Sequence, residues 1–203
     1  MTINNIKVSE SYSYDAYKDL LNKLFAENKT TGENHSEAMM HYAKMNIQRM
    51  KRWDKTVQLS SEVIDVVAQI NEKQTWYVLT EGWCGDAAQN LPFINKIASI
   101  NEHIELKMIL RDENLEIMDQ YLTNGGRSIP KLFALDAEGN ELFQWGPRPA
   151  PVQKMAVERK ENPESISYED YNINAQKWYN KDKGATVQNE FTALISRLVL
   201  QKL

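Results

Sequence analysis

The chain has 203 residues, of which 42% are hydrophobic, and this is enough for one domain with a sizeable buried core. Its 24 basic and 28 acidic residues leave a net charge of −4, which argues against nucleic acid or an anionic membrane as a partner held by overall charge. No apolar run approaches the roughly 20 residues that span a bilayer. The chain has a single cysteine, and residues 1–7 lack the pattern of a signal peptide, so we expect a cytoplasmic protein.

Two amphipathic helices are predicted first. Residues 14–27 place apolar side chains at helical spacing after two serines that can cap a helix, and residues 28–34 favour a loop. A second helix, which follows Ser36 and runs to about residue 53, has a stripe of methionine and aromatic side chains, for which we prefer core packing over a soft-metal or partner-binding surface. Arg49 and Arg52 flank this stripe, and they form either a solvated face or a basic group near the cysteine.

The central strand follows a third helix, which is predicted from residue 60 or 61 to residue 70. Residues 75–80 are a nearly continuous run of β-branched, aromatic and aliphatic side chains, which is typical of a strand buried on both faces. After a turn at residues 81–83, residues 87–100 have an apolar helical face. Pro92 interrupts this helix, and we expect it to kink the axis.

Cys84, the only cysteine, is therefore expected at or just before the N-terminus of that helix. Unpaired N–H groups and the helix dipole favour a negative charge there, which lowers the pKa of a cysteine from about 8.5 by up to about one and a half units. Asp86 opposes this effect if its carboxylate points toward the sulfur. The sequence thus predicts a thiolate as a substantial minority species and leaves the contribution of Asp86 open.

The rest of the chain is predicted to contain a strand and a helix, then a long segment, and finally a last helix. Residues 103–110 alternate as in a strand, and residues 114–122 favour a helix that glycines end. The proline-rich residues 146–151 cannot pair in a sheet, and a charged and then an aromatic stretch follow them. Residues 186–200 have the apolar side of a last helix.

The residues around the cysteine resemble a known motif. Residues 83–87, Trp-Cys-Gly-Asp-Ala, resemble the active-site motif of the thioredoxin family, with Pro92 eight positions after the cysteine. Residues 127–132 are similar to the segment that carries that family's cis-proline, and residues 132–146 are similar to its terminal β-hairpin. Order and spacing match over about residues 63–146. The resemblance implies an α/β, thioredoxin-like three-layer fold with a central mixed sheet flanked by helices.

Two departures from the family pattern bear on the chemistry. Ala87 stands where the usual second cysteine would be, and Val78 stands where many thioredoxins carry a buried carboxylate. A single cysteine cannot complete an intramolecular dithiol and disulfide cycle. Cys84 can still attack a disulfide or a peroxide if an external thiol resolves the adduct.

The resemblance assigns roles to the residues near Cys84. It implies a cis Ile129–Pro130 peptide bond beside the cysteine, which exposes a backbone edge for an extended substrate. Trp83 is expected to form an apolar rim, with simple core packing as the alternative. The predicted site therefore has Cys84 as its catalytic residue, and its predicted substrate-binding residues are Trp83, Gly85, Asp86, Ile129 and Pro130.

Other kinds of site do not fit the spacing. A peroxiredoxin-like site needs a threonine three residues before the cysteine, whereas Thr80 lies four before it. Glutaredoxin-like glutathione binding places two glycines after the cis-proline, whereas residues 125–126 precede Pro130. The histidines lie on three different predicted segments, so we expect no metal site and no cofactor. They are His35, His41 and His103.

We therefore expect one thioredoxin-like domain, and the expected parts are a helical extension (1–58), the core (59–146), an insertion (147–185) and a C-terminal helix (186–203). The leading hypothesis is a thiol–disulfide redox protein that uses Cys84 with an external resolving thiol, acting on a protein or low-molecular-weight disulfide or thiol. The alternative is a redox-inactive, thioredoxin-fold protein-binding module whose extension and insertion form the partner surface, because fold alone does not decide function. Whether the protein is an enzyme and how it oligomerises stay open.

Overall fold

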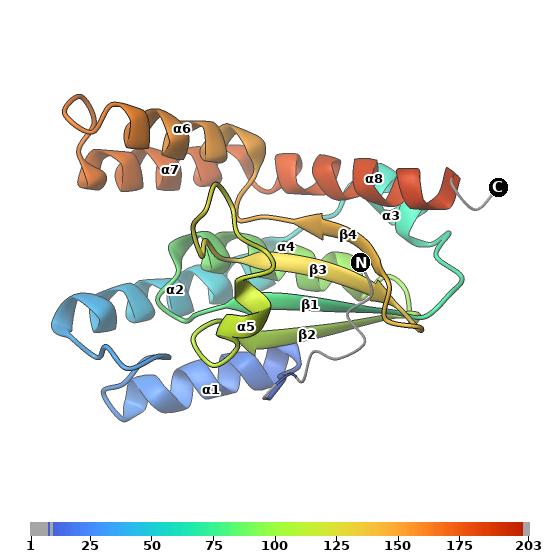
Figure 1. Cartoon of the computed structure of the whole chain (residues 1–203), viewed down its shortest axis with the longest axis horizontal. Coiled ribbons are helices and arrows are strands. Elements are labelled where there is room, and N and C mark those ends of the chain that lie inside the picture. Colours follow the sequence, from blue (N-terminus) through green and yellow to red (C-terminus); the bar gives the residue numbers. More distant parts are fainter. Residues whose placement is uncertain (1–7, 9, 201–203) are drawn as a thin grey trace.

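The structure, a computed structural model, describes residue 8 and residues 10–200. Within these residues, four strands form one mixed sheet in the order β2-β1-β3-β4 (Figure 1). β1 (Gln74–Thr80) pairs in parallel with β2 (Ile104–Leu110) and antiparallel with β3 (Lys131–Asp136). β3 pairs antiparallel with β4 (Glu141–Trp145), which completes a hairpin at the edge. The predicted central mixed sheet is confirmed.

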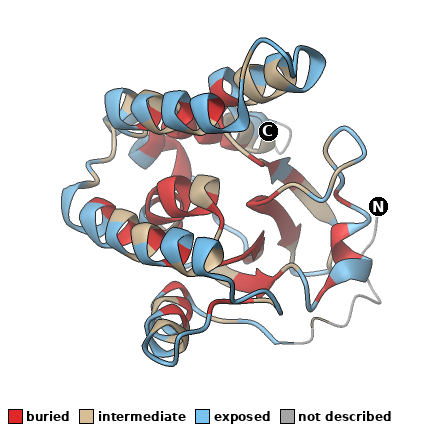
Figure 2. Cartoon of the chain, turned by 90° about the vertical axis from the view of Figure 1, so that its left-hand side faces the viewer, coloured by how far each residue is buried: buried red, intermediate tan, exposed pale blue. Residues whose placement is uncertain are grey.

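The central strand β1 is packed on both faces, as its continuous apolar run predicted. Successive side chains of a strand point to opposite faces. Trp76 packs on Phe191 of α8 (Ala185–Leu200) with 5.6 Å between ring centroids, and Tyr77 stacks on Phe133 on the other face at 5.3 Å. Figure 2 shows the buried residues gathered on the strands and on the sides of the helices that face them.

Helices cover both faces of the sheet (Figure 1). α3 (Ser61–Val67), α4 (Gly85–Ala98) and α8 pack together on one face. The short α5 (Leu115–Met118) lies on the opposite face. α1 (Tyr14–Ala26) runs beside β2, where the backbones of Tyr12 and Met108 exchange two hydrogen bonds of 2.8 Å.

Three further helices lie outside these layers. α2 (Glu37–Thr56) packs along α4. Within residues 147–185, α6 (Ala150–Glu161) and α7 (Tyr168–Asp182) lie side by side and stand out from the sheet (Figure 1). These two helices share a small apolar cluster of their own. It consists of Val152, Tyr171, Ala175 and Tyr179.

Some predicted boundaries differ from the structure. The helix expected over residues 114–122 is α-helical only in α5, because Tyr121 turns in to stack on Phe133 with 4.4 Å between centroids. α4 begins at Gly85, earlier than predicted, and runs through Pro92 without ending. The prediction that residues 1–7 lack a signal peptide concerns residues outside the described part of the chain. The same holds for residues 201–203, at the end of the predicted C-terminal segment. Among the helices in the described part of the chain, none combines the length and apolar character needed to cross a bilayer.

Candidate functional site

Cys84 is the N-cap residue of α4, as the sequence predicted. Its Sγ accepts a hydrogen bond from the N–H of Ala87 at 3.4 Å, the contact through which a capping side chain satisfies an unpaired donor in the first turn. The Sγ also donates to the carbonyl oxygen of Ile129 at 3.2 Å. The sulfur is thus fixed between the first turn of α4 and the segment that leads into β3.

The same position keeps Cys84 protonated. Only 8% of the residue is exposed, and this burial is the larger of the causes that raise the pKa of its thiol to about 12. The negative charge of Asp86 raises the pKa further, whereas the Ala87 N–H and the charge of Arg148 act in the opposite direction. The helix N-terminus therefore does not outweigh burial, and the substantial thiolate fraction expected from the sequence was wrong, because burial keeps the sulfur in the thiol form at neutral pH.

Ile129 and Pro130 lie beside the sulfur. The peptide bond between them is cis, and both residues are buried. Gly146 packs closely against this segment with a φ of +107°, and a side chain there would collide with the carbonyl of Pro130. The strand-end glycine thus lets the hairpin close against the segment that holds the Cys84 thiol.

The Asp86 carboxylate points into the insertion. It accepts a hydrogen bond from Nε of Arg148 at 2.8 Å and another from the hydroxyl of Tyr179 at 2.8 Å. The side chains of Arg148 and Asp86 are only 16% and 13% exposed, so the ion pair is largely shielded from water. Asp86, which the sequence analysis considered for its effect on the pKa of Cys84, therefore also anchors residues 147–185 to the cysteine motif.

A second set of polar contacts joins α2, α4 and α7. The indole N–H of Trp53 donates to Oε1 of Gln89 at 2.5 Å, and Nε2 of Gln89 donates to Oε1 of Gln176 at 2.6 Å. Arg52 adds a contact of 2.8 Å with the amide oxygen of Asn180. The predicted extension and insertion thus meet over the N-terminal half of α4.

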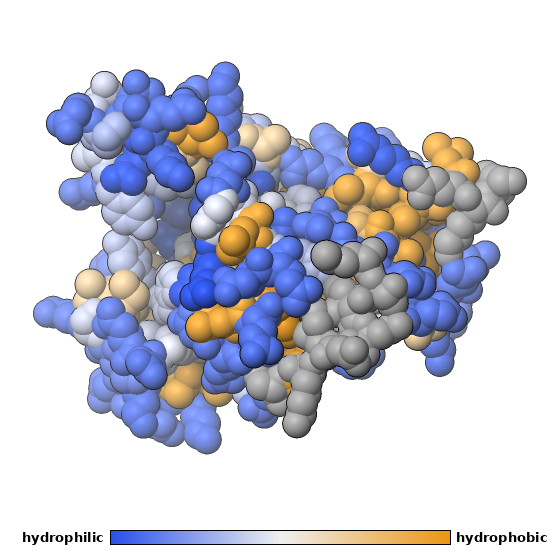
Figure 3. Space-filling view, in the orientation of Figure 1, coloured by the Kyte–Doolittle hydropathy of each residue, from blue (hydrophilic) through white to orange (hydrophobic). Residues whose placement is uncertain are grey.

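These contacts leave a cavity of about 330 Å³ over Cys84. Its walls include Arg49 from α2 and Tyr171 from α7, and Gly85 and Ile129 lie beside the sulfur. Figure 3 shows the surface hollowed at the left, between the part that carries α6 and α7 and the part that carries α2. Of the predicted site residues, Trp83, Cys84, Gly85, Asp86 and Ile129 line this cavity, whereas Pro130 does not.

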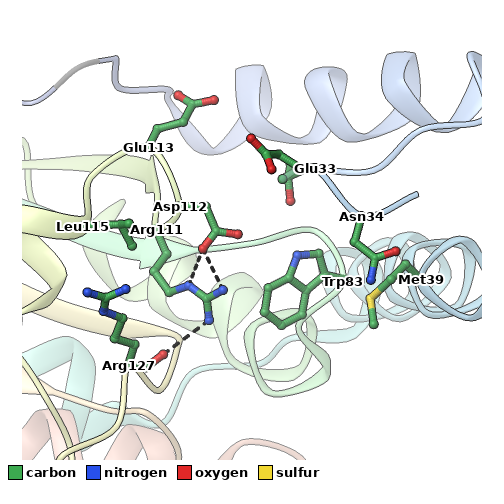
Figure 4. Close-up of a pocket in the computed structure, with 11 residues that line it drawn as sticks. Glu33, Asn34, Met39, Trp83, Arg111, Asp112, Glu113, Leu115 and Arg127 are labelled. Carbon is green, nitrogen blue, oxygen red and sulfur yellow. Dashed lines mark hydrogen bonds and ion pairs between the residues drawn. The ribbon is translucent and has the colours of Figure 1, made fainter. Parts of the chain in front are cut away.

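Trp83 lies between this cavity and a neighbouring one of about 850 Å³ (Figure 4). The guanidinium of Arg111 lies over its ring, 4.9 Å from the centroid, and is held by Asp112 at 2.7 Å and by the carbonyl of Arg127 at 3.4 Å. Trp83 is half-buried and lines both cavities. It therefore contributes to the wall of the site as well as to packing.

Comparison with known proteins identifies the family of this chain. A family model described as thioredoxin matches residues 32–169, about two thirds of the sequence. The chain belongs to the thioredoxin family. The match includes α2 and α6, so these helices lie within the segment that the family model describes. No curated protein matches.

Two solved structures share this thioredoxin-like fold at low sequence identity. An HIV epitope-scaffold protein is 22% identical with a TM-score of 0.55, covering 86% of this chain and 96% of its own. A protein of unknown function from Pseudomonas aeruginosa is 18% identical with a TM-score of 0.53, covering 91% of this chain and 98% of its own. At such low sequence identities these similarities show the fold alone.

Several residues of this thioredoxin-family site were not singled out from the sequence. Arg148 and Tyr179 hold Asp86, yet they lie 62 and 93 positions away from it, and no local pattern marks them as its partners. Glu81 is buried, accepts the N–H of Asp112 at 2.9 Å, and has its pKa raised mainly by burial. Its position directly after the central strand was the available signal. Within the described residues, no three metal-binding side chains are grouped to hold an ion.

Proposed function

We propose that this protein is a thioredoxin-fold binding module in which Cys84 stays a protonated thiol while a ligand or partner occupies the cavity above it. The observation that carries the proposal is the state of the sulfur, which is buried, donates to the Ile129 carbonyl and has a pKa of about 12. At pH 7 far less of such a thiol is ionised than the few per cent of a free cysteine. The proposed cytoplasmic setting would keep this thiol reduced.

The walls of the cavity support a binding role. They come from α2 and α7, on either side of the motif, and include both apolar rings and charged groups. Asp86 is used to fix the insertion, so its carboxylate is not available as a proton acceptor for Cys84. The motif residues thus serve mainly to shape the floor of a binding site.

A monothiol redox protein is the second candidate, and one contact favours it. The N–H of Ala87 points at Sγ of Cys84, which would stabilise a thiolate once the proton has left. The thiolate would attack one sulfur of a bound disulfide, form a mixed disulfide and release the other sulfur as a thiolate. An external thiolate would then attack the substrate sulfur of the mixed disulfide, form a new disulfide with it and release Cys84 as a thiolate.

The pH dependence of Cys84 alkylation by iodoacetamide in the native protein separates the two candidates. Because the folded-state pKa is raised, the reaction should be slow at pH 7–8 and accelerate only above about pH 10. Cys84→Ser provides the blank, since the chain has no other cysteine. Partners retained from cell extract should be the same with this variant. A midpoint below pH 8, or loss of every partner with Cys84→Ser, would support the redox candidate instead.

A further inference from the structure

Arg49 projects from α2 into the wall of the cavity over Cys84. It is half-buried, and its Nη1 donates to Oδ1 of Asn46 at 2.8 Å. A methyl group added to Gly85 would lie 3.6 Å from the same Nη1. The guanidinium is thus held beside the first residue of α4, directly after the cysteine.

The other arginines that line this cavity each have a carboxylate partner. Arg148 pairs with Asp86 at 2.8 Å, Arg111 with Asp112 at 2.7 Å and Arg127 with Asp119 at 2.7 Å.

Arg49 forms no ion pair with any described residue. Burial lowers the pKa of its guanidinium and the neighbouring charge of Arg52 lowers it further, whereas Asp86 acts in the opposite direction. Both oxygens of Asp86 are already engaged by Arg148 and Tyr179. The cavity wall therefore has one partly desolvated positive charge without a matching anion, an arrangement that a bound anion would stabilise.

We propose that the cavity over Cys84 binds a monocarboxylate ligand whose carboxylate pairs with Arg49. This inference rests on the proposed function, because it names the ligand class of the same binding site. A guanidinium offers two parallel N–H groups that match a planar carboxylate. A phosphate monoester fits less well, because it carries up to two charges at neutral pH and only one guanidinium lacks a partner.

The remaining walls suggest the shape of the ligand. Three tyrosines line the cavity: Tyr42 and Tyr168 are 38% and 58% exposed, and Tyr171 is 9% exposed. Flat aromatic walls favour a ligand with an apolar or aromatic body. A volume of about 330 Å³ is at the lower end of small-molecule sites. A compact aromatic carboxylate therefore suits the cavity.

The test is calorimetric titration of the full chain with benzoate and, as its uncharged counterpart, benzamide. Benzoate should bind to the wild type, and benzamide should bind at least about tenfold more weakly. Arg49→Met should weaken benzoate binding by about 10- to 100-fold, the range expected for hydrogen bonds to charged groups. Arg49→Lys should give an intermediate affinity, because it keeps the charge and loses the paired N–H groups.

Lys51→Met is the matched control, since it removes a positive charge from the same helix at a residue that lines a different cavity. Its benzoate affinity should equal that of the wild type. Thermal unfolding of each variant confirms that the protein measured is folded. Equal benzoate affinity in the wild type and a folded Arg49→Met, equal binding of benzamide, or no saturation by benzoate would each overturn the proposal.

A further titration distinguishes a protein from a small molecule as the source of the carboxylate. It uses a capped peptide with one glutamate and, for comparison, the same peptide with glutamine in its place. Preference for the glutamate peptide over benzoate would assign the carboxylate to a protein partner, and preference for benzoate would assign it to a small molecule. The preferred ligand should bind at least about tenfold more weakly to Arg49→Met, and equal binding of the glutamate and glutamine peptides would exclude a peptide carboxylate as the partner of Arg49. Failure of the proposed function would appear separately, as fast alkylation of Cys84 at pH 7–8 whether or not benzoate binds.

Discussion

The sheet with α4 and the pair α6–α7 are held by different forces, and Cys84 lies where the two regions meet. The sheet region has a continuous apolar core in which Trp76, Phe93 and Phe191 are almost completely inaccessible to water. The α6–α7 pair has only a small cluster of its own, and charged or polar side chains such as Arg148 join it to the motif. Apolar packing is tolerant of direction, whereas these polar contacts need fixed geometry. The sheet region therefore provides stability and the direct contacts of the sulfur, and the pair contributes a wall of the cavity over it.

The largest effect is expected from a cavity in the sheet region. Trp76→Ala should lower the free energy of unfolding by about 3–5 kcal/mol, because the indole is fully buried and its neighbours cannot fill the space. Urea unfolding measures the loss. Leu122→Ala, at a residue that is 43% exposed, is the control and should change stability little. A loss below about 1 kcal/mol in Trp76→Ala would contradict the assignment of stability to this region.

A smaller effect is expected from separating the two regions. Arg148→Met leaves the Asp86 carboxylate largely buried without its cation, which should cost about 2 kcal/mol, less than for a fully buried pair because both side chains retain some contact with water. Hydrogen exchange should show the loss of protection mainly in α6 and α7. Lys154→Met, which removes an exposed charge from α6, is the control. Equal loss of protection in the β-strands would mean that the regions do not open separately.

The smallest effect is expected at the sulfur itself. Asp86→Asn removes the charge that raises the pKa of Cys84 and leaves Arg148 in place, so the pKa should fall and alkylation should become faster at a given pH. The shift should be partial, because burial is the larger cause and remains. Asp65→Asn, on an exposed face of α3, should leave the alkylation midpoint unchanged. A midpoint that rises in Asp86→Asn would reverse the assigned sign.

The sheet region was largely predictable from the sequence, because its signals are local. The apolar run of β1 indicates a buried strand, and the motif at the start of α4 indicates the N-cap of a helix. Each signal lies within a few residues. Where a tertiary contact overrides local preference the prediction was wrong, as at Tyr121, which stacks on Phe133 instead of continuing α5.

The α6–α7 pair was not predictable to the same degree. Prolines and charges in residues 147–164 obscure helical periodicity, so this part was described only as an insertion that leaves the sheet. The contacts of Asp86 join residues far apart in the chain, and the sequence left the direction of its carboxylate open. The predicted roles of the residues near Cys84 stay predictions until ligands are tested.

The shared carboxylate of Asp86 also has a consequence for the sequences of relatives. Asp86, Arg148 and Tyr179 satisfy one another in a largely buried place, so replacing any one alone leaves a polar group without its partner. Substitutions at these three positions should therefore be inherited together. Relatives that keep an aspartate two positions after the cysteine should keep the arginine beyond the hairpin, and those that lose the α6–α7 pair should lose the aspartate as well.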